Sequence, residues 1–131
     1  MGAYSEGLGR YLNRDEATLK TTGAETASTT HSPVEVGDKA VINVEVLVSA
    51  VTGTTPTMLI TIEGSNDGLT WYALGEIGSD SFGIGSLAAP ANITAAGTYR
   101  AALPAARYVR SKSTITGTTP SFTYGIALSA A

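Results

Sequence analysis

The sequence predicts an all-β protein, an antiparallel β-sandwich or jelly-roll-like fold of about eight or nine strands with an extended N-terminal arm. Two runs alternate between inward and outward positions with the period of two that is typical of half-buried strands, around Val44–Val48 and Met58–Glu63. Stretches rich in Gly, Pro, Asn and Asp separate the extended runs. A chain of 131 residues has room for one domain.

The composition narrows the class of protein. Only 15% of the residues are charged, against about a quarter in an average globular protein, which argues against a disordered chain or a coiled coil. No apolar run is long enough to span a membrane, and the net charge of −3 argues against nucleic acid as the main ligand. With no cysteine and one histidine, His31, we expect no metal site and no cofactor.

Residues 1–32 are expected to form the N-terminal arm, and residues 33–131 the sandwich domain. The arm places apolar side chains at the spacing of an amphipathic helix face, although two glycines interrupt it at a cost of about 1 kcal/mol each; these side chains are Tyr4, Leu8, Tyr11 and Leu12. Either the arm is mobile, or these side chains become ordered by docking on a neighbouring subunit. Weaker strands are expected near residues 18–22 and 33–36.

A repeated segment organises the chain. Val51–Met58, VTGTTPTM, returns as Ile115–Phe122, ITGTTPSF, 64 residues later. In each copy the glycine can supply a positive φ and the proline fixes its own φ, which is typical of a tight connection. We interpret the copies as two hairpins on facing sheets, one joining residues 40–51 to 57–63 and the other joining residues 107–115 to 122–128.

The remaining elements follow from turn chemistry and alternation. Gly64–Gly68 is a turn before a third extended run at residues 70–74, residues 79–90 are a long loop, and weaker strands are expected near residues 92–94 and 98–102. Alternation predicts a core that contains Val46, Ile60, Ile62, Trp71, Phe122 and Ile126, with Glu45, Thr61 and Thr123 on the opposite faces of their strands. For the strand at 107–112 the sequence leaves open whether Tyr108 or Val109 points inward.

Charge is divided along the chain. All 11 acidic residues lie at or before Asp80, and the only formal charges after it are those of Arg100, Arg107, Arg110 and Lys112. This division either creates a face that attracts an acidic partner or cancels within the fold, and we favour cancellation against Glu45 and Glu63. If Val109 is buried, Tyr108 and Arg110 become surface residues, and with Lys112 they are candidates for contact with a partner.

The sequence contains no catalytic constellation, and we predict that the protein is not an enzyme. His31 lies in a turn-like Thr-Thr-His-Ser-Pro segment without a nucleophile motif. Glu63, Asn66 and Asp67 could ligate calcium, but turn formation explains this segment better, because it lacks the acidic density of a dedicated loop.

Two segments resemble the small β-sandwich virion proteins of tailed bacteriophages. They are TGTTPTMLITIEGSNDGLTWYALG, at Thr52–Gly75, and ARYVRSKSTITGTTPSFTYGIAL, at Ala106–Leu128. A Gly-Thr-x-Pro hairpin, a Ser-x-Asp-Gly-x-x-Trp turn and an Arg-Tyr-Val-Arg strand recur in this order in those proteins. The resemblance covers about residues 33–128 and implies a structural component of the virion, a head decoration (cement) or minor capsid protein on the outer shell.

The same resemblance sets the expected partners. They are the major capsid protein or other virion subunits, within a particle assembled in the bacterial cytoplasm, and we expect a homo-oligomer without nucleic-acid or membrane ligands. A tail or baseplate component is the alternative location.

A second resemblance is local. The Ser65–Trp71 turn, followed by the Ala106–Arg110 strand, is similar to discoidin-type (coagulation factor type C) modules, which implies a carbohydrate- or lipid-binding module. This chain departs from that family because it has no cysteine pair at its ends and because a second TGTTP segment follows the Arg-Tyr-Val-Arg strand.

Overall fold

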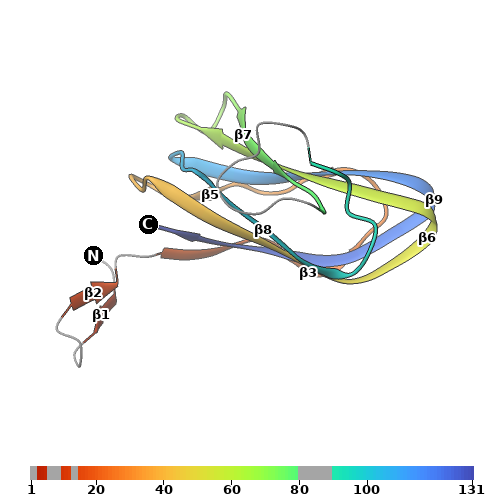
Figure 1. Ribbon diagram of the computed structural model, residues 1–131. Helices are drawn as coiled ribbons and strands as arrows, with labels where there is room; N and C mark the ends of the chain where they lie inside the picture. Colours follow the sequence, from red (N-terminus) through yellow and green to blue (C-terminus); the bar gives the residue numbers. More distant parts are fainter. Residues whose placement is uncertain (1–2, 6–9, 13–14, 80–89) are drawn as a thin grey trace.

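The computed structural model describes residues 3–5, 10–12, 15–79 and 90–131, and all regular elements among them are strands. In chain order these are β1 (Ala3–Ser5), β2 (Arg10–Leu12), β3 (Asp15–Glu25), β4 (Thr29–Thr30), β5 (Val34–Glu35), β6 (Val41–Ser65), β7 (Tyr72–Ile77), β8 (Gly97–Pro104) and β9 (Tyr108–Ala130). The predicted all-β, sandwich-like fold is confirmed: two layers of antiparallel strands face each other (Figure 1).

The framework is a single two-stranded ribbon that folds over itself. β6 and β9 pair antiparallel along almost their whole lengths, from Ile42 opposite Ala130 to Ser65 opposite Tyr108. Both strands bend in the middle, where Thr54 lies opposite Thr118, so that each strand contributes one half to each layer (Figure 1). The apolar faces of the two half-ribbons are thereby brought together, which is the physical reason for the bend.

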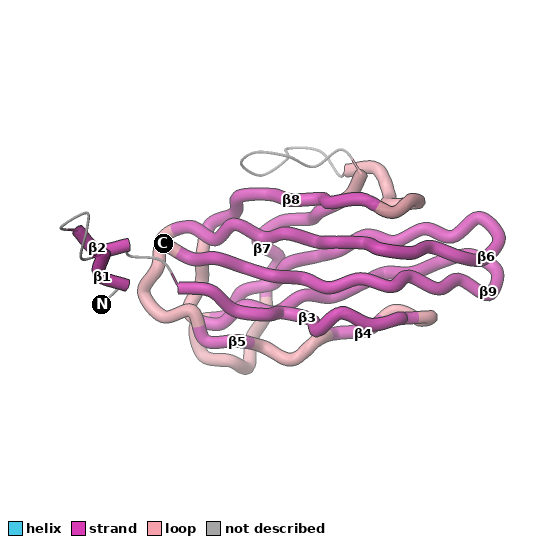
Figure 2. Tube along the Cα trace, turned by 90° about the horizontal axis from the view of Figure 1, so that it is seen from below, coloured by secondary structure: helices cyan, strands magenta, loops and turns pink. Residues whose placement is uncertain are grey.

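Each layer has the half-ribbon at its centre and short strands at its edges. In one layer β3 pairs with the second half of β9, and β8 pairs with the first half of β6. In the other, β4 and β5 pair with the first half of β9, and β7 pairs with the second half of β6. The start of β3, the C-terminus and the loop between β6 and β7 lie at one end of the sandwich, and the bend lies at the other (Figure 2).

The repeated TGTTP segments are this bend, and the interpretation of them as two hairpins is wrong. Residues 41–48 pair with residues 124–130 and not with residues 57–63. The two copies pair with each other across the ribbon, and their close contacts are reciprocal. A Cβ atom placed on Gly53 would lie 2.7 Å from the carbonyl oxygen of Thr119, and one on Gly117 would lie 2.8 Å from that of Thr55.

The core lies between the layers and follows the alternation that the sequence predicts. Val46, Ile60, Ile62, Phe122 and Ile126 are buried, as predicted, together with side chains from β3, β7 and β8 that include Leu19, Ile77 and Leu103. The predicted outward positions are confirmed for Glu45, which is exposed, and Thr61 and Thr123 are half-buried. Trp71 is only half-buried, so its assignment to the core is wrong.

The open question about the strand at 107–112 is resolved by Val109, which is fully buried and followed inward by Ser111 and Ser113. In β6 the inward positions keep the same parity on both sides of the bend, whereas in β9 they change from odd to even numbers. The register of β6 shifts between Val48 and Ala50, which is the signature of a β-bulge. Because β6 has one extra residue there, its inward side chains stay at even numbers on both sides of the bend, while those of β9 change from odd to even numbers.

The boundary at residue 32 is wrong, because residues 15–30 belong to the sandwich. β3 runs for 11 residues along β9, and β4 also pairs with β9. The described part of the arm is limited to β1 and β2, which pair with each other as an antiparallel hairpin. In the weak strand expected near residues 92–94, only Ile93 pairs, in a single bridge to Met58. Residues 80–89 of the predicted long loop lie outside the described residues.

Candidate functional site

Trp71 and Arg110 form the centre of a surface cluster at the end of the sandwich opposite the bend. The guanidinium carbon of Arg110 lies 4.1 Å from the centre of the Trp71 ring, a cation–π contact, and its Nε donates to Glu63 Oε1 at 2.8 Å. Glu63 is directly opposite Arg110 in the ribbon, so the strand register itself sets up this pair. The cancellation of charge that we favoured is confirmed for Glu63, whereas Glu45 lies opposite Arg100 of β8.

The loop between β6 and β7 extends this cluster with a rigid turn. Asp67 accepts hydrogen bonds from the backbone N–H groups of Leu69 and Thr70 at 2.8 and 2.9 Å, and from the hydroxyl of Ser65 at 3.0 Å. The backbone hydrogen bonds, the largest influence, and that of Ser65 hold the pKa of the Asp67 carboxyl below its ordinary value. The turn presents Leu69, whose exposed fraction is 84%.

Tyr108 borders the same loop. Its ring lies 3.8 Å from the position that a Cβ atom on Gly68 would occupy, and Arg107 lies over it with its guanidinium carbon 5.1 Å from the ring centre. Tyr72, at the start of β7, is 43% exposed. We call the residues Leu69, Trp71, Tyr108 and Arg110 the aromatic patch. Trp, Tyr and Arg are the residues that most often carry binding energy in protein interfaces.

The structure brings together only some of the predicted partner-contact residues. Tyr108 and Arg110 belong to the aromatic patch, whereas Lys112 is exposed one step further along β9, opposite Thr61. In the arm, Tyr4 lies opposite Tyr11, and Leu12 lies opposite Ala3, so these residues are in a hairpin and not on a helical face. Leu8 lies outside the described residues.

A polar network connects the two layers near the end of β3 and at β4, which both pair with β9. His31 bonds to the Ser111 hydroxyl through Nδ1 at 2.6 Å and to Glu25 Oε2 through Nε2 at 2.7 Å. The other oxygen of Glu25 accepts hydrogen bonds from the hydroxyls of Ser113 and Tyr124, each at 2.6 Å. The network therefore joins side chains from both layers around one carboxylate.

This environment shifts the acid–base properties of its members. Burial alone would raise the pKa of the Glu25 carboxyl, but hydrogen bonds from Ser113, Tyr124 and His31 outweigh it and hold that pKa below its ordinary value. Burial, with the Glu25 carboxylate beside it, raises the pKa of the Tyr124 phenol far above its ordinary value. Burial lowers the pKa of Lys20, which lies 4.2 Å from the centre of the Tyr124 ring.

The order Ser111, His31, Glu25 matches the sequence of contacts in a hydrolytic triad, but its setting does not suit catalysis. Ser111 is fully buried, and the side chain of His31 is only 8% exposed. A nucleophile must reach its substrate, and this serine is enclosed within the fold. The geometry fits a stabilising connection between the layers.

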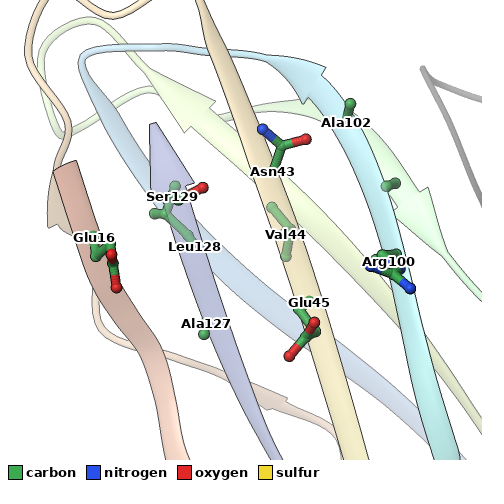
Figure 3. Close-up of a pocket in the computed structure, with 10 residues that line it drawn as sticks. Glu16, Asn43, Val44, Glu45, Arg100, Ala102, Ala127, Leu128 and Ser129 are labelled. Atoms are coloured by element: carbon green, nitrogen blue, oxygen red, sulfur yellow. The ribbon is translucent and has the colours of Figure 1, made fainter. Parts of the chain in front are cut away.

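The outer face of the layer that contains β3 and β8 carries a hollow of about 550 Å³ (Figure 3). Glu16 and Arg100 stand on its opposite sides, and Asn43, Glu45 and Ser129 project from the central strands. The other lining residues are Val44, Ala101, Ala102, Ala127 and Leu128, so none of the described residues lines it with an aromatic side chain. The described lining therefore differs from the apolar and aromatic lining that is common in small-molecule sites.

No group of three or more Asp, Glu or His side chains within residues 15–79 and 90–131 is arranged to hold a metal ion. Nor does this part of the chain contain a helix that could cross a bilayer.

Sequence reasoning missed Leu69 and the network around Glu25. The Ser65–Trp71 turn is visible in the sequence, but its exposed tip depends on the side-chain bonds of Asp67. Comparison of the chain with protein-family models, with curated proteins and with solved structures finds no match.

Proposed function

We propose that the protein is a non-enzymatic structural component of a tailed-bacteriophage virion, a decoration (cement) or minor capsid protein that binds the outer shell and stabilises it. The observation that carries this proposal is the aromatic patch. It combines a highly exposed leucine on a rigid turn with Trp, Tyr and Arg side chains, and a preorganised patch loses little conformational entropy when a partner docks.

The position of the patch also supports docking. Loop 65–71 lies at the same end of the sandwich as the start of β3, from which the N-terminal arm departs (Figure 1). A patch and an arm at one end can act together on one surface, and repeated copies on a shell add many modest interfaces. The resemblance of Thr52–Gly75 and Ala106–Leu128 to virion proteins points to the same role.

The carbohydrate-binding alternative has less support from the aromatic side chains. A sugar usually stacks on an exposed aromatic ring, and one face of Trp71 is covered by Arg110. We therefore keep the virion role as the proposal, and the tail or baseplate as its alternative location.

The experiment is a binding and melting assay on empty shells of the phage whose genome encodes the chain. We expect the purified protein to bind the shells and to raise their melting temperature, and we expect Leu69→Asp to weaken binding while leaving the protein folded. Asn66→Asp, in the same exposed loop, is the matched control for added charge and should bind more strongly than Leu69→Asp. Shells that melt at the same temperature with and without the protein would refute the cementing role, and immunogold label on the tail alone would move the protein there.

A further inference from the structure

We infer that the outer face of the layer that contains β3 and β8 is a docking surface for the N-terminal segment, residues 1–14, of a second copy of this chain. The face includes the hollow of about 550 Å³ (Figure 3). This inference does not rest on the virion role, because it concerns how copies of the protein associate with each other.

The first observation is that this face exposes apolar side chains beside a continuous trough. β6 presents Val41 and Leu47 here, and these side chains are 42% and 53% exposed. Only two other large apolar side chains among the described residues are exposed, and both lie at the loop between β6 and β7. A second hollow of about 330 Å³ beside Leu47 shares Glu45 and Ala127 with the first, so the two form one trough along β9. An exposed apolar surface of this kind marks a site of contact with another segment.

The second observation is a set of charges without partners. Glu16 and Arg100 stand on opposite sides of the larger hollow, and Glu45 projects from a central strand (Figure 3). In the part of the chain that the structure describes, these three side chains form no ion pair, although Glu45 lies opposite Arg100 in the strand register. Lys20, which lines the smaller hollow, is already held by three backbone carbonyl oxygens. The trough therefore offers two carboxylates and one guanidinium group to a partner.

The third observation, charge complementarity, identifies the occupant. Residues 1–14 carry the opposite set of charges, with two basic side chains, Arg10 and Arg14, and one acidic side chain, Glu6. The same segment contains the four large apolar residues that the sequence singles out as candidates for partner contact. Matching charges orient a docked segment, and its apolar residues can cover those that the face exposes.

The fourth observation is that the N-terminal hairpin needs a surface to pack on. β1 and β2 have three residues each and pair with each other in a sheet of their own. An isolated two-stranded hairpin is marginally stable at best in water. The hairpin lies beyond the end of the sandwich in both views, past the start of β3 (Figures 1 and 2). It therefore extends away from the trough of its own copy and toward a neighbour, and two copies that exchange these segments form the same contact twice.

Cross-linking between two different variants tests the occupant directly, because the chain has no cysteine. One variant carries Leu12→Cys in the N-terminal segment, and the other carries Ala127→Cys at an exposed position in the trough. We expect a short bismaleimide to join the two variants into a product of twice the 13.4 kDa mass, identified by mass spectrometry. In the control, Thr114→Cys, exposed on the other layer, replaces Ala127→Cys and should give far less of the mixed product.

Charge reversal in the full chain tests the complementarity. Glu16→Arg combined with Glu45→Arg should weaken self-association by about tenfold, measured by sedimentation of a dilution series. Arg10→Glu combined with Arg14→Glu should weaken it by a similar factor. A variant with all four substitutions should return to within about threefold of wild type, because opposite charges face each other again.

The matched control for net charge is Glu35→Arg combined with Asp38→Arg, at two exposed acidic residues outside the trough, and it should associate like wild type. A wild-type protein that stays monomeric across the dilution series would overturn the inference. So would a four-substitution variant that associates no better than the two-substitution variants. An intramolecular cross-link in a dilute chain that carries both Leu12→Cys and Ala127→Cys would place the segment in its own trough and overturn the exchange between copies. None of these measurements involves shells, so the cementing role is tested separately.

Discussion

Replacing Gly53 by alanine tests the folded ribbon, because this glycine is needed for two separate reasons. Its φ of +115° is a conformation that L side chains rarely adopt, which costs about 1–3 kcal/mol. Its Cβ atom would also lie 2.7 Å from the Thr119 carbonyl oxygen and 2.9 Å from the Pro120 Cα atom, which are backbone atoms of the partner strand. The bend would have to open to relieve this overlap, so we expect a total loss of about 3–5 kcal/mol.

Gly117 and Gly37 supply the comparisons. Gly117→Ala should cost the same as Gly53→Ala, because its added Cβ would lie 2.8 Å from the Thr55 carbonyl oxygen and 2.9 Å from the Pro56 Cα atom. Gly37 also has a positive φ, of +82°, but none of the described atoms lies within 4 Å of an added Cβ. Gly37→Ala should therefore cost only the conformational part, about 1–2 kcal/mol.

The measurement is urea unfolding followed by the fluorescence of Trp71, the single tryptophan. The close approach of the two bends predicts that both bend variants lose at least about 1 kcal/mol more than Gly37→Ala. Equal losses for Gly53→Ala and Gly37→Ala would refute the close approach. A large loss for Gly53→Ala with none for Gly117→Ala would refute its reciprocity.

Three other substitutions probe the core, the network and the strain. Ile60→Ala, at a fully buried position of β6, should lose about 2–5 kcal/mol in urea unfolding, and a loss below about 1 kcal/mol would contradict its place in the core. Glu25→Gln should lose about 1–3 kcal/mol at pH 7, because the amide cannot accept all the hydrogen bonds of the carboxylate. Since the folded pKa of Glu25 is below its ordinary value of 4.5, its contribution is complete above that pH and is lost as the pH falls through the folded pKa. The free energy of unfolding measured across that range should therefore fall more for wild type than for Glu25→Gln, and parallel pH profiles would contradict the network. Thr55 has a φ of 48°, in the left-handed region that β-branched residues rarely adopt, so Thr55→Asn should raise stability by about 1 kcal/mol, and a loss of stability would show that this positive φ is not strained.

Local patterns were sufficient to predict which side chains face inward, because alternation along a strand depends only on the strand itself. Ile60, Ile62 and Phe122 are buried for that reason. The pairing of strands was predicted wrongly, since a hairpin turn and a bend in a continuous ribbon both call for a glycine with positive φ followed by proline. Only contacts between residues about 60 positions apart, such as Thr54 with Thr118, distinguish the two.

Trp71 shows the same limit for the candidate site. A large apolar side chain beside a strand predicts burial, but the register of β6 and β9 places Arg110 over the ring and leaves both at the surface. Tyr108 and Arg110 could be predicted as surface residues once Val109 was assumed to be buried. The network around Glu25 could not be predicted, because its members are up to 99 residues apart and form no motif.

Electron cryomicroscopy of phage particles that carry the protein tests the proposed function most directly. We predict density for a two-layered sandwich on the outside of the head, with the aromatic patch in contact with the shell or a neighbouring virion subunit. Heads without this density, in particles shown by mass spectrometry to contain the protein, would contradict its role as a cement of the shell.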